Sequence, residues 1–227
     1  MRFIDYKTSE VLMQSLASAV EVELNDAIKN RGVATFVIPG GKTPKPFFRI
    51  LRDANIEWDK ITIFPTDERW VSMESSRSNA GLIQSQLLTG RAAEANFVPL
   101  YQRNKTLDQG ASSLAESISN YLPLDVLVLG MGLDMHTASL FPGSPGLALA
   151  QSVNAAEVVP IIPLDKGLEP RVTLSARVLE KAVNTHVLII GLDKKNALKE
   201  AVKREPASAP ISQFLPNATV HWSPASG

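Results

Sequence analysis

The sequence predicts an α/β fold, built on a mainly parallel sheet with helices on both faces. Short apolar runs of strand length alternate along the chain with longer segments of helical periodicity. These runs are apolar throughout, which is typical of parallel strands that helices cover on both sides. The 227 residues include no long linker rich in Gly, Ser or Pro. We therefore expect one domain over residues 1–227.

The first predicted element is a helix over residues 9–30. Thr8 is suited to cap its start and Gly32 to end it. A strand is then expected over 33–38, and Pro44 is well placed in the first turn of the next helix. The apolar face expected for the first helix consists of Val11, Leu12, Leu16, Ala19, Val20, Val22 and Leu24.

The alternation continues to the end of the chain. Strands are expected over 61–64, 125–129 and 185–190, with weaker candidates at 158–162, 172–174 and 219–222. Helices are expected over 78–88, 108–121, 175–182 and 193–204. Ligands of open α/β sheets bind beyond the carboxyl ends of the strands. The segments that follow the strands are therefore the places to search for a site.

Composition and charge exclude several classes of protein. The absence of cysteine excludes a disulfide framework, a thiol nucleophile and a Cys-ligated metal. Lys+Arg and Asp+Glu both total 23 and the basic residues are dispersed, which disfavours a nucleic-acid partner. The first residues predict no signal peptide, and no stretch approaches the roughly 20 apolar residues of a membrane span. We expect a cytoplasmic protein without a membrane partner, as a monomer or a weak homo-oligomer.

The loop over residues 39–44 is the first candidate site segment. Gly40 and Gly41 would let backbone N–H groups approach an anion, and the following helix start adds partial positive charge. Lys42 and Thr43 lie in the same loop, where Thr43 can donate a hydroxyl. A tight turn that needs positive φ is the alternative interpretation. The spacing before the lysine excludes a Walker A loop.

Two carboxylates and an arginine follow the strand expected over 61–64, at Asp67, Glu68 and Arg69. Such a group can orient sugar hydroxyls or tune a neighbouring pKa. Taken alone, a solvated strand end with an ion pair is the favoured interpretation. Further along, Arg77 places a cation at a helix start, and helix capping does not explain it.

The sharpest motif follows the strand expected over 125–129. Two glycines lead to Asp134, which precedes His136 by two residues. The unperturbed pKa of histidine suits proton transfer near neutral pH, and an adjacent aspartate can hold its tautomer and raise its basicity. Met135 occupies the third glycine position of a dinucleotide fingerprint, which excludes that motif. The position and the flanking acid favour a catalytic histidine over a structural one.

Cations also lie near two later strand ends. Arg171 and Lys194 are suited to holding a phosphate. For Lys194, a solvated helix face is the alternative interpretation. The remaining histidines, His186 and His221, lie in expected strands and are predicted to have structural roles.

These motifs, taken in order and spacing over nearly the whole chain, resemble the 6-phosphogluconolactonase family. They are GGKTP (40–44), DERWV (67–71), SNAG (78–81), GMGLDMHTASLFPG (130–143), PRVTLS (170–175) and GLDKKNAL (191–198). The resemblance implies a modified Rossmann-like fold shared with the glucosamine-6-phosphate deaminases, and no cofactor. It implies hydrolysis of 6-phospho-D-glucono-1,5-lactone to 6-phosphogluconate in the oxidative pentose phosphate pathway.

The resemblance also implies roles for particular residues. His136 would be the base that activates water, with Asp134 beside it, and Arg77 resembles a cation that stabilises developing negative charge. The family usually has glycine where this chain has Met135. If that glycine has positive φ, methionine there is strained by roughly 1–2 kcal/mol. The expected substrate-binding residues are Gly40, Gly41, Lys42, Thr43, Asp67, Arg69, Arg171 and Lys194.

Two alternatives remain open from the sequence. A glucosamine-6-phosphate deaminase would follow the Asp-x-His core with Phe-Asn-Glu-Pro, whereas Phe141 occupies the place of that acid here. The missing carboxylate argues against ring-opening chemistry. A non-catalytic sugar-phosphate sensor would bind 6-phosphogluconate without turnover, and Met135 would then mark a decayed site. No serine lies in a G-x-S-x-G elbow, so an acyl-enzyme is not expected.

Overall fold

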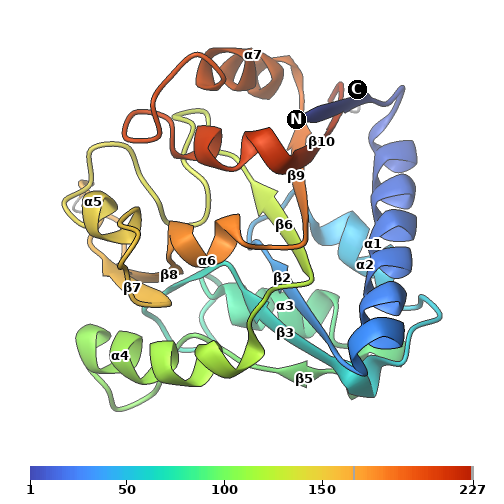
Figure 1. Cartoon of the computed structure of the whole chain (residues 1–227), viewed down its shortest axis with the longest axis horizontal. Helices are drawn as coiled ribbons and strands as arrows, with labels where there is room; N and C mark the ends of the chain where they lie inside the picture. The colour runs from blue at the N-terminus through green and yellow to red at the C-terminus, as the bar shows by residue number, and fades with distance from the viewer. Residues whose placement is uncertain (166, 226–227) are drawn as a thin grey trace.

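The structure, a computed structural model, describes residues 1–165 and 167–225, and its larger sheet is parallel throughout (Figure 1). The strand order in that sheet is β1-β10-β9-β6-β2-β3-β5. The strands are β1 (Arg2–Asp5), β2 (Ala34–Ile38), β3 (Ile61–Pro65), β5 (Asn96–Phe97), β6 (Val126–Gly130), β9 (Asn184–Ile190) and β10 (Ala218–Ser223). The predicted mainly parallel sheet is thereby confirmed.

Helices cover both faces of this sheet, as Figure 1 shows with α1 and α2 on one side and α4 to α6 on the other. The α-helices are α1 (Ser9–Arg31), α2 (Lys45–Leu51), α3 (Asn79–Gln86), α4 (Leu107–Ile118), α5 (Leu147–Ala150), α6 (Ala176–Glu180) and α7 (Leu192–Ala201). Short 3-10 helices span Trp58–Lys60, Gly90–Glu94, Ser119–Tyr121, Pro210–Gln213 and Leu215–Asn217.

The hydrophobic core is split by the larger sheet into two clusters. In β6, Val126 and Val128 face the cluster under α1 and α2, whereas Leu127 and Leu129 face the cluster that contains α4 residues. Alternate side chains of one strand therefore enter different clusters, and this is why the strands read as apolar without alternation.

The first helix begins and ends as predicted, but its buried face differs. Thr8 accepts a hydrogen bond from the Val11 backbone, and Gly32 ends the helix at φ 80°. Val11 and Val22, expected on the apolar face, are 51% and 59% exposed. The buried side chains follow rows four residues apart, because positions i and i+4 share one helix face. They are Leu12, Met13, Leu16, Ala17, Val20, Leu24 and Ile28.

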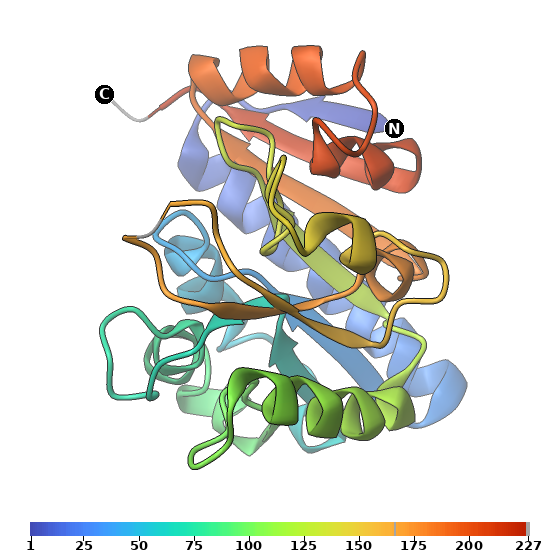
Figure 2. The same ribbon diagram turned by 90° about the vertical axis from the view of Figure 1, so that its left-hand side faces the viewer.

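A second, antiparallel sheet holds β4 (Asp67–Arg69), β8 (Arg171–Leu174) and β7 (Val158–Ile161) in the order β4-β8-β7. Figure 2 shows the β7–β8 hairpin in gold, crossing one face of the larger sheet. Its apolar side chains, such as Val159 and Val172, join the same core cluster as Leu127. The weaker strand candidates at 158–162 and 172–174 therefore exist, but they pair with each other and with β4 instead of extending the parallel sheet. The third candidate, at 219–222, is β10, which lies in the parallel sheet between β1 and β9.

Two strands of the larger sheet escaped prediction. Edge strand β1 carries Arg2 and Asp5, and edge strand β5 has only Asn96 and Phe97. Both lack the apolar run that marks an interior strand. None of the helices in the described part of the chain combines the length and the apolar content needed to cross a membrane.

Candidate active site

A cavity of about 290 Å³ lies where the carboxyl ends of β2, β3, β6 and β9 meet. This is the edge where open α/β sheets bind ligands, and the volume is near the lower limit for small-molecule sites. The expected site residues that line it are Gly40, Gly41, Thr43, Asp67, Arg69, His136, Arg171 and Lys194. Segments more than 150 residues apart in the sequence thus contribute to one cavity.

The glycine loop after β2 leaves no space for a side chain at Gly40 and has a left-handed backbone at Gly41. A Cβ on Gly40 would lie 1.8 Å from Oδ1 of Asn79, and Gly41 has φ +93°, in the left-handed region. The positive φ of Gly41 agrees with the turn interpretation, whereas the approach of this backbone to an anion stays a prediction. Lys42 is exposed and does not line the cavity, which departs from its expected role in binding.

His136 lines the cavity from the loop after β6, and Asp134 of the same loop contacts its imidazole ring. Nδ1 of His136 lies 2.5 Å from Oδ1 of Asp134. The hydrogen bond to His136 is the main cause that holds the pKa of Asp134 below its usual range. A carboxylate at Nδ1 favours the tautomer with the proton there, which leaves Nε2 as the basic nitrogen. Asp134 itself does not line the cavity.

Met135 has φ 66°, which is the left-handed conformation expected for the usual glycine. The loop keeps its turn, because Gly132 donates to the carbonyl of His136 at 2.9 Å and Met135 donates to that of Gly132 at 3.1 Å. The Met135 side chain packs against the core cluster that contains Leu127. The methionine is therefore accommodated without removing His136 from the cavity.

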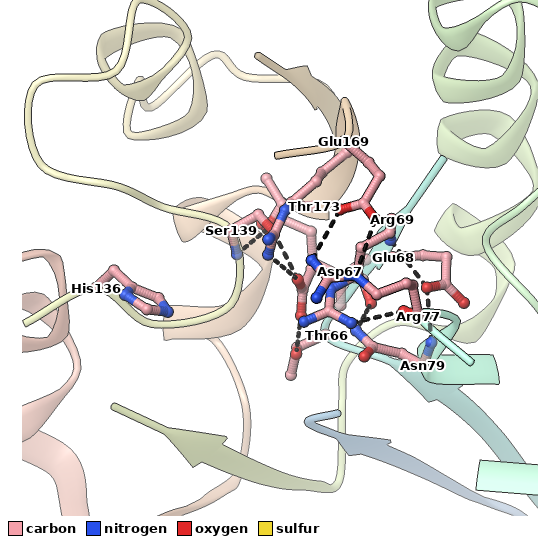
Figure 3. A network of polar contacts seen from close by, with 12 residues as sticks. Thr66, Asp67, Glu68, Arg69, Arg77, Asn79, His136, Ser139, Glu169 and Thr173 are labelled. Carbon is pink, nitrogen blue, oxygen red and sulfur yellow. Dashed lines mark hydrogen bonds and ion pairs between the residues drawn. The ribbon is translucent and has the colours of Figure 1, made fainter. Parts of the chain in front are cut away.

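The acidic segment after β3 is buried, so its favoured interpretation as a solvated strand end is wrong. Asp67 is 5% exposed and Glu68 is fully buried. Asp67 accepts hydrogen bonds from the hydroxyls of Thr66 at 2.9 Å and Ser139 at 2.5 Å. Figure 3 shows these side chains gathered at one end of the site, with His136 apart from them. Residues after β3 and β6 are thus joined by Asp67.

A buried cation, Arg171, and a half-buried one, Lys194, line the cavity. The Arg171 side chain is 8% exposed, and its guanidinium lies over the Phe141 ring, 5.0 Å from the centroid. Lys194 donates to the carbonyl of Met131 at 2.7 Å. Burial is the main cause that lowers the pKa of both groups, opposed by Asp67 at Arg171 and by Asp134 at Lys194. Cations that are partly withdrawn from water are suited to an anionic ligand, because charge-assisted hydrogen bonds are stronger there.

Two arginine nitrogens in the site are buried without a partner in the described residues. They are Nε of Arg69 and Nε of Arg171. Buried donors without a hydrogen bond are uncommon and call for an explanation. Since both arginines line the cavity, a bound anion that accepts from them is the explanation we favour.

Arg77 departs from its expected place. It does not line the cavity, and its guanidinium makes two hydrogen bonds to Glu169, of 2.8 and 3.0 Å. This hydrogen bonding lowers the pKa of Glu169 to about 2. Figure 3 shows the pair beside Arg69 and away from His136. A contact between Arg77 and the reacting carbonyl would require the pair with Glu169 to open.

Asn79 lines the cavity although it is absent from the expected site residues. Ser78 is the actual cap, because its hydroxyl accepts from the Gly81 backbone at 3.1 Å. Asn79 is thereby free to donate through Nδ2 to the carbonyl of Asp67 at 2.8 Å. The sequence does not tell which of Ser78 and Asn79 caps the helix and which lines the cavity, since both residue types suit a helix start. Only their positions in the structure separate the two roles.

The other two histidines lie in a separate buried network. Nδ1 of His186 is 3.0 Å from Nε2 of His221, and Nε2 of His186 is 2.7 Å from Glu23. The Tyr6 hydroxyl lies 2.9 Å from Nδ1 of His221. Neither histidine lines the cavity, which agrees with their predicted structural roles. Among the described residues, no cluster of three or more His, Asp or Glu side chains has an arrangement that could hold a metal ion.

The fold and the site define an α/β protein whose cavity is lined by a histidine that pairs with an aspartate, and by the cations of Arg171 and Lys194. The sequence profile described as "Glucosamine-6-phosphate isomerases/6-phosphogluconolactonase" matches residues 7–222. The chain therefore belongs to this family.

Individual relatives agree with this assignment. A 6-phosphogluconolactonase of Rhizobium meliloti is 38% identical over 96% of this chain and 97% of its own. One of Pseudomonas putida is 37% identical over 95% of this chain and 90% of its own. The crystal structure of a 6-phosphogluconolactonase from Shewanella baltica matches with a TM-score of 0.94 at 33% identity, covering 100% of this chain and 98% of that one.

Proposed function

We propose that this protein hydrolyses 6-phospho-D-glucono-1,5-lactone to 6-phosphogluconate, with His136 as the general base. The observation that carries the proposal is the His136–Asp134 pair at a cavity that also holds Arg171 and Lys194. Hydrolysis of the uncharged lactone ring requires a base, and binding of the attached phosphate is favoured by the two cations. The names of the relatives support the same reaction.

The proposed step begins when His136 takes a proton from water through Nε2. The water oxygen attacks the lactone carbonyl, and a tetrahedral oxyanion forms. The bond from this carbon to the ring oxygen then breaks, and the ring oxygen takes the proton back from the imidazolium. Atoms and charge balance without a cofactor, and general base catalysis of this kind contributes about 10²–10⁴ in rate.

The phosphate is proposed to lie against the backbone of Gly41, the hydroxyl of Thr43, and the cations of Arg171 and Lys194. Support comes from their common cavity and from the low solvent exposure of Arg171. Charge-assisted hydrogen bonds to a phosphate are stronger than neutral ones, and burial strengthens them further. With the phosphate bound by these groups, the lactone ring would extend toward His136.

A role for Arg77 in stabilising the oxyanion stays a prediction, because its guanidinium is bound to Glu169 in this structure. An exposed cation that already has a counter-ion contributes less than a buried free one. We therefore expect Arg77→Ala to lower kcat/KM by less than about tenfold, well below the loss caused by removing the base.

The test generates the lactone in situ and follows its loss against spontaneous hydrolysis. Wild type, His136→Ala, Asp134→Asn and Arg77→Ala are assayed together. We expect His136→Ala to lower kcat by about 10²–10⁴ while binding of 6-phosphogluconate changes little. Asp134→Asn should give an intermediate loss, because it permits the wrong imidazole tautomer. Unchanged turnover in His136→Ala would remove the proposal for the base.

The same assay separates the alternatives. Tight binding of 6-phosphogluconate without acceleration by the wild type would favour the sensor. Release of ammonia from glucosamine 6-phosphate would favour the deaminase. Phe141 argues against the deaminase, because its ring packs 4.7 Å from that of His136, at the place in the sequence where the deaminase has its acid.

The proposed reaction places the enzyme in the oxidative pentose phosphate pathway, immediately after the oxidation that forms the lactone. The cytoplasmic location, the absence of a cofactor and the expected monomer or weak homo-oligomer stay predictions from the sequence.

A further inference from the structure

Glu68 is a fully buried carboxylate that is absent from the expected site residues. Four donors surround it. Its Oε1 accepts from the backbone N–H groups of Arg69 and Asn79, both at 2.8 Å. Its Oε2 accepts from the Ala80 backbone at 2.7 Å and from the Ser78 hydroxyl at 2.9 Å. One side chain thus joins strand β4 to the first turn of α3.

Burial of the Glu68 carboxyl opposes its ionisation. Burial is the main cause that raises the pKa of Glu68, and the hydrogen bonds from Ala80, Asn79 and Ser78 only oppose it. A group whose folded pKa is raised stabilises the fold at low pH and loses that contribution as pH rises through the folded pKa. The contribution of Glu68 to stability is therefore smaller at neutral pH than at low pH. A residue kept under these conditions calls for a role beyond packing.

The residues that Glu68 fixes lead directly to the cavity. Arg69 and Asn79 both line it. Asn79 also bonds the Asp67 carbonyl, and it fills the space beside Gly40 that a Cβ would need. Arg69 donates through Nη1 to the carbonyl of Arg77 at 2.5 Å. A shift of either backbone would therefore move polar groups that face the ligand.

We propose that Glu68 is a positioning residue for substrate binding, which acts by fixing the backbone of Arg69 and Asn79 at the wall of the cavity. It does not touch the substrate. The guanidinium of Arg69 and the amide of Asn79 are held in a set geometry before the ligand arrives. These side chains therefore lose little conformational entropy on binding. This inference rests on the proposed function for the choice of ligand.

The experiment measures 6-phosphogluconate binding by calorimetry, together with KM and kcat for the lactone, in wild type and Glu68→Gln. Glutamine has nearly the same shape, but its amide offers one acceptor oxygen and turns a donor toward other donors. We expect Kd and KM to rise at least about tenfold, equivalent to about 1.4 kcal/mol, with kcat within about threefold. Thermal unfolding confirms that the variant is folded.

A second pair of variants tests the route through Asn79. If Glu68 acts through this residue, Asn79→Ala and Glu68→Gln together should weaken binding by less than the product of the single effects. Full additivity of the two free energies would contradict transmission through Asn79. A folded Glu68→Gln with unchanged Kd and KM, or with a loss in kcat alone, would overturn the proposal.

Ser78→Ala keeps the proposal testable if Glu68→Gln fails to fold. It removes one donor to Glu68 and the cap of α3, and we expect Kd to rise about threefold. Thr106→Ala is the matched control, because Thr106 caps α4 in the same way but bonds Gln109 instead of Glu68. Equal Kd values for both variants and wild type would overturn the proposal.

Failure of this inference is distinguishable from failure of the proposed function. If wild type binds 6-phosphogluconate without hydrolysing the lactone, the proposed function fails, and a weaker Kd in Glu68→Gln still supports the positioning role. If wild type hydrolyses the lactone and Glu68→Gln matches it in Kd and KM, only the positioning role fails.

Discussion

Met135 holds a backbone conformation that usually belongs to glycine. Its φ of 66° falls in the left-handed region, where a Cβ approaches the following carbonyl oxygen. The residue is held there by its hydrogen bond to Gly132, by the bond that its own carbonyl accepts from Ile211, and by core contacts of its side chain. Side-chain burial and loop hydrogen bonds thus offset the backbone strain beside the proposed catalytic histidine.

We expect Met135→Gly to be more stable than Met135→Ala by about 1 kcal/mol. Both variants remove the side chain, and only alanine retains the clash of the left-handed conformation. Urea unfolding measures the difference. The control is Ser18, an exposed position within α1, where Ala should be more stable than Gly by roughly 0.5–1 kcal/mol. The same order at both positions would show that position 135 is unstrained.

At the scale of elements, the cavity is built where loops from different strands press together. The loop after β2 meets the first turn of α3 through Gly40 and Asn79, and Asp67 joins β4 to Ser139 of the loop after β6. The Arg77–Glu169 pair joins the segment before α3 to the segment before β8. These contacts, more than the strands themselves, decide which side chains face the ligand.

We expect Gly40→Ala to weaken 6-phosphogluconate binding by at least about tenfold, because the new Cβ displaces the Asn79 amide from the cavity wall. Calorimetry measures the change. Gly32→Ala is the control, since Gly32 has φ +80° at the end of α1 with open space around it. That variant should lose about 1 kcal/mol of stability and bind normally. Normal binding by Gly40→Ala would show that the loop tolerates a side chain.

At the scale of the whole molecule, the two core clusters stabilise the sheet, and a polar network is buried among its strands. His221 of β10 contacts His186 of β9 and stacks on Tyr6, while Glu23 of α1 faces His186. Burial, His186 and Arg2 lower the pKa of His221 to about 3. A histidine in the unfolded chain has a pKa of about 6.5.

Stability should therefore fall as pH decreases below the unfolded pKa of His221, because the unfolded chain binds a proton that the folded chain excludes. From about pH 6.5 to pH 5 this group alone accounts for about 2 kcal/mol. Urea unfolding of wild type and His221→Gln over this range tests the sign and the size. We expect a shallower pH dependence in the variant, and identical slopes would assign the acid sensitivity to other groups.

The sequence by itself determined the parallel sheet, the first helix with its cap at Thr8, and the segments from which the site is made. Apolar run length and capping residues are local properties, and they suffice for these elements. They could not reveal that Asp67 and Glu68 are buried, because burial depends on β8, which pairs with β4, and on the first turn of α3, which bonds Glu68. Because these patterns are local, they also placed Val11 and Val22 on the apolar face of the first helix, although both are exposed.

Only the tertiary structure decided which site residues meet. It brings Arg171 and Lys194 to the cavity of His136, and it leaves Arg77 bound to Glu169. Sequence distance carries no information on such contacts, since they arise where separate loops converge at one sheet edge. The sequence contains the residue types that the chemistry needs. Tertiary packing sets the distances between these residues and the partners, such as Glu169 for Arg77, that compete for them.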